Sequence, residues 1–492
     1  MTAEDPGNAG DGRDLGRHGR YLSWMLSADL LGKGLGVVFF AYVARQLEVT
    51  EHGWYGVYLA FVPILGVLMT AGLNDLLVRE VSKDASALPG IMTNGFLIQI
   101  AFFGLLFMGV RYFCAAVGYD PALQQIVGIA AVTAFFAGVY NAHVAALSAY
   151  EAFRPISLLQ LFPRLVVVPG GMLVLALGGG VFALVVFMAA SHAVQAGLAH
   201  GVLWRRHGMP WGRLNGGRLR YVMAHGAPMV LGRVGSRGYY SADLPLLQAI
   251  GPAAAAGYYA VGARFQGLLL TFGDLFETLF YPVLGRRAQS GGEAQAFAVL
   301  RFLKFMALMG FPMAVGAVVV GEALVVFLAG ERYAPGAPVL AVLVATLALA
   351  FLDRAITIFL RTRGRQGLPM AVYTGAFAAK VAAAIVVLPV WGVTGLLIVH
   401  ATISCGITLL LGFFLLRVLP ELRLRELLGA LWGPALAAFI MGGALWFVRD
   451  ESVLWTIPAG AVVYGAGLAA LRVFDDFDRE LVRSALQSKG RA

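Results

Sequence analysis

The sequence is poor in charge and in cysteine. Charged residues make up 13% of the 492 residues, about half the fraction typical of a soluble domain. The two cysteines, Cys114 and Cys405, both lie in apolar segments, so we interpret them as small buried hydrophobic residues. This composition excludes a soluble globular protein and a small disulfide-stabilised domain.

Sequence motifs of several enzyme classes are also missing. We find no phosphate-binding loop with its lysine, no His-Glu-x-x-His and no nucleophile elbow. Loops on the predicted outer side do not exceed about ten residues, whereas a membrane-bound polymerase or acyltransferase usually places its chemistry in a long outer loop. We therefore predict no catalytic residues, no metal site and no cofactor, and a protein that is not an enzyme.

Apolar residues dominate the chain. They account for 59% of it, and the mean hydropathy is +0.78. Apolar runs recur from end to end, each long enough to cross about 30 Å of hydrocarbon. These runs predict an all-α polytopic membrane protein with about 14 transmembrane helices. The first run continues through Phe40 without a small-residue cleavage site, so we interpret it as a retained helix and not a signal peptide.

The placement of basic residues predicts the topology. Alternate loops put 26 of the 37 Lys and Arg residues on one side, and only Arg45, Arg111, Arg332 and Arg449 on the other. By the positive-inside rule both termini are cytoplasmic, which requires an even number of spans. Much of the net charge of +10 is therefore a topological signal, and we predict no nucleic-acid partner.

A weak internal repeat divides the chain. An offset of 204 residues pairs Gly53 with Gly257 and Tyr55 with Tyr259. Six spans separate the copies, which predicts two parallel six-helix lobes related by an axis along the membrane normal. The expected parts are a disordered cytoplasmic lead (1–20), an N-lobe (21–204), a basic cytoplasmic linker (205–220), a C-lobe (221–418), two added spans (419–472) and an amphipathic cytoplasmic tail (473–492).

The repeated segments carry a resemblance to a known family. Residues 44–84, with the turn Gly-Trp-Tyr-Gly followed by Gly72, Leu73, Arg79 and Glu80, resemble the N-terminal signature of the Wzx-type polysaccharide flippases. Residues 243–265 resemble the same signature. These flippases belong to the multidrug/oligosaccharidyl-lipid/polysaccharide (MOP) exporter superfamily. The resemblance implies a V-shaped pair of six-helix bundles, alternating access, and an undecaprenyl-diphosphate-linked glycan as substrate.

Cations within the spans are the candidate substrate-binding residues. Arg233 and Arg237 lie one helical turn apart in the seventh span, so they share a face and repel each other. Such charges in a bilayer need acidic partners or a hydrated anionic ligand. Arginine suits a diphosphate because its guanidinium group binds phosphate through two hydrogen bonds. We expect Arg233, Arg237, Lys33 and Arg264 to line one cationic cavity.

Internal ion pairing is the alternative interpretation of these cations. Seven intramembrane cations face seven intramembrane acids, so pairing alone would leave the membrane region neutral. Asp29, Asp75, Asp274 and Glu277 are candidates both for such pairing and for binding a coupling proton or sodium ion. Lys380 is expected to pair or to extend toward the interface. His400 is expected to be a core or interface histidine.

The leading prediction is a flippase that moves a lipid-linked oligosaccharide to the outer leaflet of the bacterial cytoplasmic (inner) membrane. Expected partners are the lipid-linked glycan, the bilayer, a polysaccharide polymerase and glycosyltransferases. Two alternatives stay open within the superfamily. A cation-coupled multidrug exporter needs an acidic, aromatic cavity, whereas the seventh span offers arginines. A lipid II flippase shares the basic cavity and the number of spans.

Overall fold

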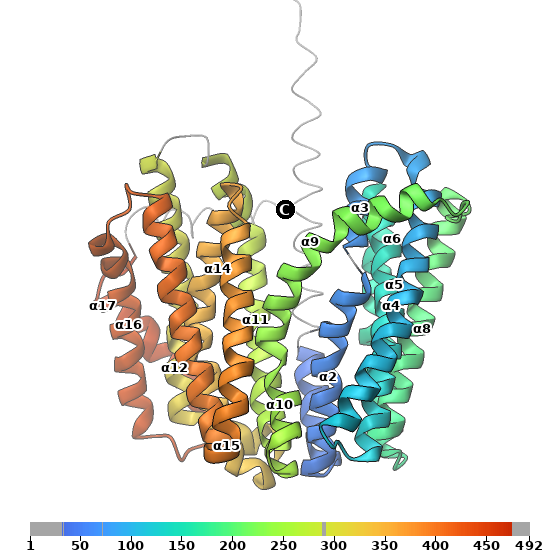
Figure 1. Ribbon diagram of the computed structural model, residues 1–492. Helices are drawn as coiled ribbons and strands as arrows, with labels where there is room; N and C mark the ends of the chain where they lie inside the picture. Colours follow the sequence, from blue (N-terminus) through green and yellow to red (C-terminus); the bar gives the residue numbers. More distant parts are fainter. Residues whose placement is uncertain (1–31, 33, 71, 288–291, 475–492) are drawn as a thin grey trace, which may run out of the picture.

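The computed structural model describes residues 32, 34–70, 72–287 and 292–474. Side chains are described for these residues except 226–229, 231, 232, 253 and 274–287. This part of the chain is helical and forms two bundles side by side (Figure 1). Ten of its helices are long and apolar enough to cross a membrane. The polytopic all-α prediction is thus confirmed, and the count of fourteen spans stays a prediction.

The N-lobe is the bundle that precedes residue 208. Its elements are the helix over 34–46, α2 (Val49–Thr70), α3 (Leu73–Val81), η1 (Ala85–Ala87), α4 (Leu88–Ala116), α5 (Pro121–Ala149), α6 (Phe153–Phe162), η2 (Pro163–Val167), α7 (Val168–Ala176) and α8 (Gly180–His207). A π-helical turn at η2 joins α6 to α7 in one span.

The C-lobe follows, with two further helices on its outer side. Its elements are α9 (Gly216–Ser241), α10 (Asp243–Ile250), α11 (Ala253–Arg287), α12 (Gly292–Ala329), η3 (Glu331–Gly336), α13 (Ala337–Ala345), α14 (Leu347–Thr362) and α15 (Gly367–Val418). The added helices are α16 (Leu424–Trp446) and α17 (Val453–Ala470). They pack on α12 through an apolar cluster that includes Leu308, Met441 and Tyr464.

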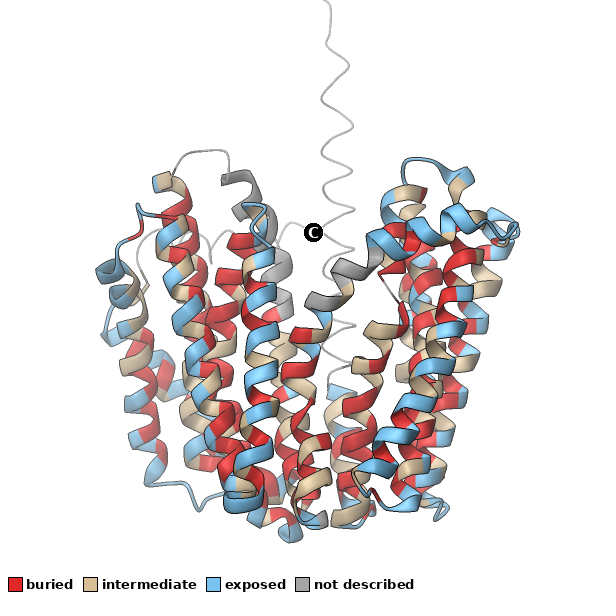
Figure 2. Ribbon diagram, viewed as in Figure 1, coloured by how far each residue is buried: buried red, intermediate tan, exposed pale blue. Residues whose placement is uncertain are grey.

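The two lobes meet at one end and diverge toward the other (Figure 1). At the closed end one apolar cluster joins them: Tyr58 and Leu184 of the N-lobe pack in it with Leu247, Tyr259 and Leu396 of the C-lobe. Figure 2 shows buried residues concentrated there, between α2, α10 and α11. The burial of apolar surface therefore holds the lobes together at this end.

Residues paired by the repeat touch each other across the closed end. A Cβ atom built on Gly53 would lie 2.8 Å from the backbone nitrogen of Gly257. Three residues further along both helices, a Cβ atom on Gly56 would lie 2.6 Å from Cβ of Ala260. Gly53 and Gly257 are related by the offset of 204 residues, and so are Gly56 and Ala260. Equivalent residues meet in this way near a symmetry axis, as the predicted parallel repeat requires.

Helix α9 belongs to both lobes. Near its start Val222 is part of the N-lobe core, and near its end Tyr239 is part of the C-lobe core. Asn215 caps the first turn by accepting hydrogen bonds from the backbone N–H groups of Gly217 and Arg218. In Figure 1 α9 crosses from the divergent end of the N-lobe toward the closed end of the C-lobe.

Helix α15 contains a sharp reversal. Gly392 adopts φ 54° and ψ −140°, a conformation that essentially only glycine tolerates. Lys380 and His400 would be about 30 Å apart along a straight helix, yet their side chains are 3.0 Å apart. The two arms therefore fold back on each other.

Candidate functional site

An ion pair joins the N-lobe to the crossing helix. The Arg233 guanidinium of α9 donates to both carboxylate oxygens of Asp75 on α3, at 2.9 and 2.7 Å. Both side chains are exposed, by 46% and 41%. Gly72, at φ 75°, separates α3 from α2 and starts the short helix that carries Asp75. The structure thus pairs two of the predicted site residues.

Arg237 and Arg264 are placed differently. Arg237 lies one turn beyond Arg233 on α9, is exposed, and makes no ion pair with any acidic side chain that the structure describes. Close packing fixes this stretch of α9 on α15, because a Cβ atom on Gly238 would lie 2.8 Å from the ring of Phe377. Arg264 on α11 is half-buried and interacts electrostatically with Tyr55 of α2, near the seam between the lobes.

The remaining predicted site residues fall outside the described part. Lys33 and Asp29 lie outside the described residues, as do the lead (1–20) and most of the tail (473–492). Asp274 and Glu277 lie on the described helix α11, and their side chains are outside the described set. Their roles stay predictions.

A second polar contact between α3 and α9 lies near the end of α3, toward the divergent end. Arg79 donates to the Glu80 carboxylate at 2.9 Å and to the Tyr221 hydroxyl at 3.2 Å. Tyr221 in turn donates to Glu80 at 3.2 Å. The hydrogen bond from Arg79, aided by that from Tyr221, holds the pKa of the Glu80 carboxyl below its usual range. These contacts keep the first half of α9 on the N-lobe.

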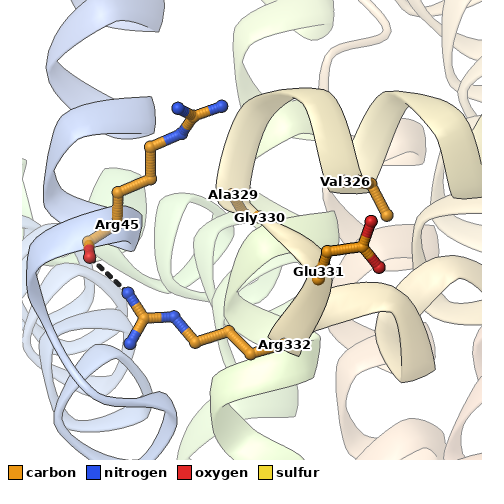
Figure 3. Close-up of a pocket in the computed structure, with 6 residues that line it drawn as sticks. All are labelled: Arg45, Val326, Ala329, Gly330, Glu331 and Arg332. Carbon is orange, nitrogen blue, oxygen red and sulfur yellow. Dashed lines mark hydrogen bonds between the residues drawn. The ribbon is translucent and has the colours of Figure 1, made fainter.

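Two arginines hold the closed end from opposite sides. Arg45 of the N-lobe donates to the carbonyl of Phe327 at 2.7 Å. Arg332 of η3 donates to the carbonyl of Arg45 (Figure 3). Together with Glu331 and the end of α12 they line a shallow pocket of about 510 Å³. Because their guanidinium groups donate to backbone carbonyls of the opposite lobe, we interpret them as part of the seal between the lobes.

Sequence reasoning missed a buried ionic cluster in the C-lobe. Lys380 is fully buried beside Asp243 and His400. Pro245 contributes to this arrangement, because it cannot donate to the carbonyl of Ser241 and the helix breaks between α9 and α10. A lysine in a long apolar run signals a functional residue by default, and that signal was available at Lys380.

The ion pair of Arg233 with Asp75 can be displaced by a competing anion. An exposed ion pair contributes about 1 kcal/mol or less, so an anionic ligand can replace Asp75 on Arg233 at little cost. Arg237, one turn away, offers a second guanidinium group on the same helix. Two neighbouring exposed arginines suit a ligand with two phosphate groups.

Comparisons with known proteins agree with this architecture. The family described as "Polysaccharide biosynthesis protein" matches residues 42–338, more than half of the chain. A search of curated proteins finds no match.

Solved structures of transporters share the fold. The lipid II flippase MurJ, in an inward closed conformation, superposes with a TM-score of 0.73 at 12% identity, covering 92% of this chain and 98% of its own. An inward-facing multidrug resistance MATE family transporter of the MOP superfamily superposes with a TM-score of 0.64 at 12% identity, covering 79% and 96%. A MOP superfamily transporter from Pyrococcus furiosus gives 0.51 at 11% identity, covering 81% and 93%.

Proposed function

The chain belongs to the polysaccharide biosynthesis protein family, and from this premise we propose that it flips an undecaprenyl-diphosphate-linked oligosaccharide across the bacterial cytoplasmic membrane. In surface or secreted polysaccharide biosynthesis, the lipid-linked glycan would enter from the cytoplasmic leaflet and leave on the outer leaflet. The predicted topology, with both termini cytoplasmic, puts the divergent end on the cytoplasmic side.

The observation that carries the proposal is the exposed pair of Arg233 with Asp75. A lipid diphosphate loses hydration when it enters the membrane, and fixed guanidinium groups in a hydrated space offset that loss. In the proposed cycle a phosphate takes the place of Asp75 on Arg233, and Arg237 binds the second phosphate. Arg264, and Lys33 in the first span, are proposed to contact the same ligand. The lipid chain stays in the bilayer.

The two alternatives differ in the cargo. A cationic drug would meet Arg233 and Arg237 with repulsion, so these arginines support the flippase over the exporter. Lipid II carries the same diphosphate as a lipid-linked oligosaccharide, and only the cargo found in cells separates these two flippases. The polymerase and the glycosyltransferases that act after and before the flippase are its proposed partners.

The test is the leaflet location of lipid-linked glycan in a strain that lacks this protein. We expect glycan to accumulate on the cytoplasmic leaflet, with surface polysaccharide lost and drug tolerance unchanged. Accumulation of lipid II with failure of cell-wall synthesis would show that the transported substrate is lipid II and not a lipid-linked oligosaccharide. Normal polysaccharide with increased sensitivity to cationic drugs would contradict the flippase proposal.

Charge reversal tests the arginines. We expect Arg233→Glu with Arg237→Glu to abolish complementation of that strain while the protein still inserts in the membrane. Arg449→Glu reverses an arginine at the opposite end of the molecule, beside Asp450, and serves as the matched control with normal complementation. Normal transport by the double variant would contradict the anion site.

A further inference from the structure

Three ionisable side chains converge inside the C-lobe. The Lys380 ammonium lies 2.7 Å from both carboxylate oxygens of Asp243 and 3.0 Å from Nδ1 of His400. The side chains are 0%, 5% and 2% exposed. Charges removed from water in this way cost several kcal/mol each unless their partners are well placed.

Every hydrogen of the ammonium has an acceptor. Lys380 donates to the carbonyl of Tyr239 at 2.9 Å, to Asp243, and to Nδ1 of His400. Since an ammonium group only donates, Nδ1 of His400 must carry no proton in this arrangement. The proton of the neutral ring is then on Nε2, which donates to the Thr346 hydroxyl at 3.2 Å. The Thr346 hydroxyl donates a hydrogen bond to the carbonyl of Leu343 at 2.9 Å.

A second proton on His400 is incompatible with this arrangement. Nδ1 also lies 3.3 Å from Oδ2 of Asp243, so a protonated ring would donate to the same carboxylate that holds Lys380. The net charge of the three groups would rise from zero to +1, with two cations about 3 Å apart. Like charges at that separation in a low-dielectric interior repel strongly. A protonated Nδ1 also can no longer accept the hydrogen bond from Lys380, so the arrangement in which the ammonium contacts both His400 and Asp243 is lost.

We propose that Asp243, Lys380 and His400 form a proton-binding site, in which a proton on Nδ1 of His400 displaces the Lys380 ammonium from Asp243. The three residues sit on α10 and on the two arms of α15, so displacement changes how these elements pack. The structure shows Lys380 on Asp243 and on Nδ1 of His400 together with divergent lobes. Because the added proton is incompatible with that arrangement, we expect it to favour a conformation in which the lobes no longer diverge. The role of this site in driving transport rests on the proposed flippase function, and the proton site itself does not.

The exchangeable species is a proton, because the ammonium already fills the position of a cation on Asp243. A tethered ammonium cannot diffuse away, and only a change of protonation can alter the charge of the cluster. Other titratable groups face it from the neighbouring helices. They are Tyr239 and Tyr240 of α9, Tyr259 of α11, Asp353 of α14 and Tyr373 of α15. Among these, Tyr259 donates to Oδ2 of Asp243 at 2.7 Å and stabilises the ionised carboxylate.

The experiment measures the separation of the lobes as a function of pH. Spin labels on Ser82→Cys and Gln366→Cys, both exposed at the divergent end, report the distance in full-length protein in lipid nanodiscs. Cys114→Ala and Cys405→Ala remove the native thiols. Between about pH 8 and pH 5, we expect the divergent population to fall, most of all toward the acidic end, because burial and the nearby Lys380 ammonium oppose a proton on His400. One linked proton changes the population ratio by up to about tenfold per pH unit.

Two variants identify the site. His400→Gln retains an acceptor for Lys380 and cannot be protonated, so we expect it to stay divergent at every pH. Asp243→Asn with Lys380→Met removes the ion pair and leaves the net charge of the protein unchanged. We expect this double variant to lose the pH response as well. It tests the site independently if His400→Gln fails to fold. His143→Gln is the matched control, a buried N-lobe histidine 3.1 Å from His200, and should keep the wild-type response.

Either of two results would overturn the proposal. One is a wild-type pH response in the folded site variants. The other is a lobe distance that follows sodium chloride at constant pH and does not follow pH. The readout needs no glycan, so it is independent of the transport assay. If the protein shows a pH response that depends on His400 but flips no glycan, the proton site is supported and the proposed flippase function is contradicted.

Discussion

At the residue scale, we propose that Asp75 occupies the Arg233 guanidinium until an anionic ligand replaces it. Because the pair is exposed, we expect Asp75→Asn to change the free energy of unfolding by about 1 kcal/mol or less. The freed guanidinium should bind inorganic pyrophosphate more tightly than in the wild type. Thermal unfolding and pyrophosphate titration of the purified protein measure the two effects.

Glu80→Gln is the control for this substitution, since Glu80 also accepts hydrogen bonds from an arginine on its own helix. It leaves Asp75 and Arg233 intact and should not alter pyrophosphate affinity. A large loss of stability in Asp75→Asn, or unchanged pyrophosphate affinity, would assign Asp75 a structural role and leave Arg233 without a ligand site.

The sequence predicts which charged residues lie within apolar spans. It does not predict which of them form ion pairs with each other. Arg233 and Arg237 stand out in an apolar run, and their shared helix follows from their spacing. Asp75 is 158 residues from Arg233 in the sequence. Any of the seven intramembrane acids could have been the partner of Arg233, because the sequence shows only equal numbers of intramembrane cations and acids. Lys380 was expected to pair or extend to the interface, and His400 to be a core residue. Their meeting depends on the reversal at Gly392 and the break before Asp243.

At the element scale, the contact between α2 and α11 depends on glycine. A Cβ atom on Gly257 would lie 2.7 Å from Cγ1 of Val49 and would collide with the Val49 carbonyl. We expect Gly257→Ala to lower the free energy of unfolding by about 1–3 kcal/mol through overpacking. Gly267→Ala on the same helix is the control, because nothing lies within 4 Å of its Cβ position. Thermal unfolding measures both, and equal stability of the two variants would contradict the close contact.

The reversal of α15 offers a second test at this scale. Gly392→Ala forces an L-residue into φ 54°, at a cost of about 1–3 kcal/mol. It should also weaken the pH response of the lobe distance, because it disturbs the approach of Lys380 to His400. Gly375→Ala on the first arm of α15 has nothing near its Cβ position and should be neutral. A stable Gly392→Ala protein with a wild-type pH response would contradict this account.

The repeat explains why some helix contacts were predictable. Six spans between equivalent glycines predict parallel lobes, and parallel lobes bring equivalent residues to a common axis. The crossing of α9 was not predictable, because the hydropathy of a helix does not determine which neighbouring helices it packs against. The packing of Val222 in one core and of Tyr239 in the other shows it.

At the scale of the whole molecule, the closed end determines which side is open. Arg45→Ala with Arg332→Ala removes hydrogen bonds between the lobes, so we expect the seal to open more often. Ala256→Cys, on a residue with 0% exposure beneath this seal, should then react faster with a membrane-impermeant maleimide added outside intact cells. Arg449→Ala, also at the closed end and paired with Asp450 on its own lobe, should leave the rate unchanged. An unchanged rate in the double variant would show that the apolar cluster alone seals this end.

The attachment of α9 to both lobes has a mechanical consequence. A helix fastened to two bodies keeps a nearly fixed length, so the bodies cannot rock about the closed end without bending it. The bend of α9 should therefore change as the angle between the two lobes changes. We therefore expect substitutions that stiffen α9 to slow the movement of the lobes even with every charge in place.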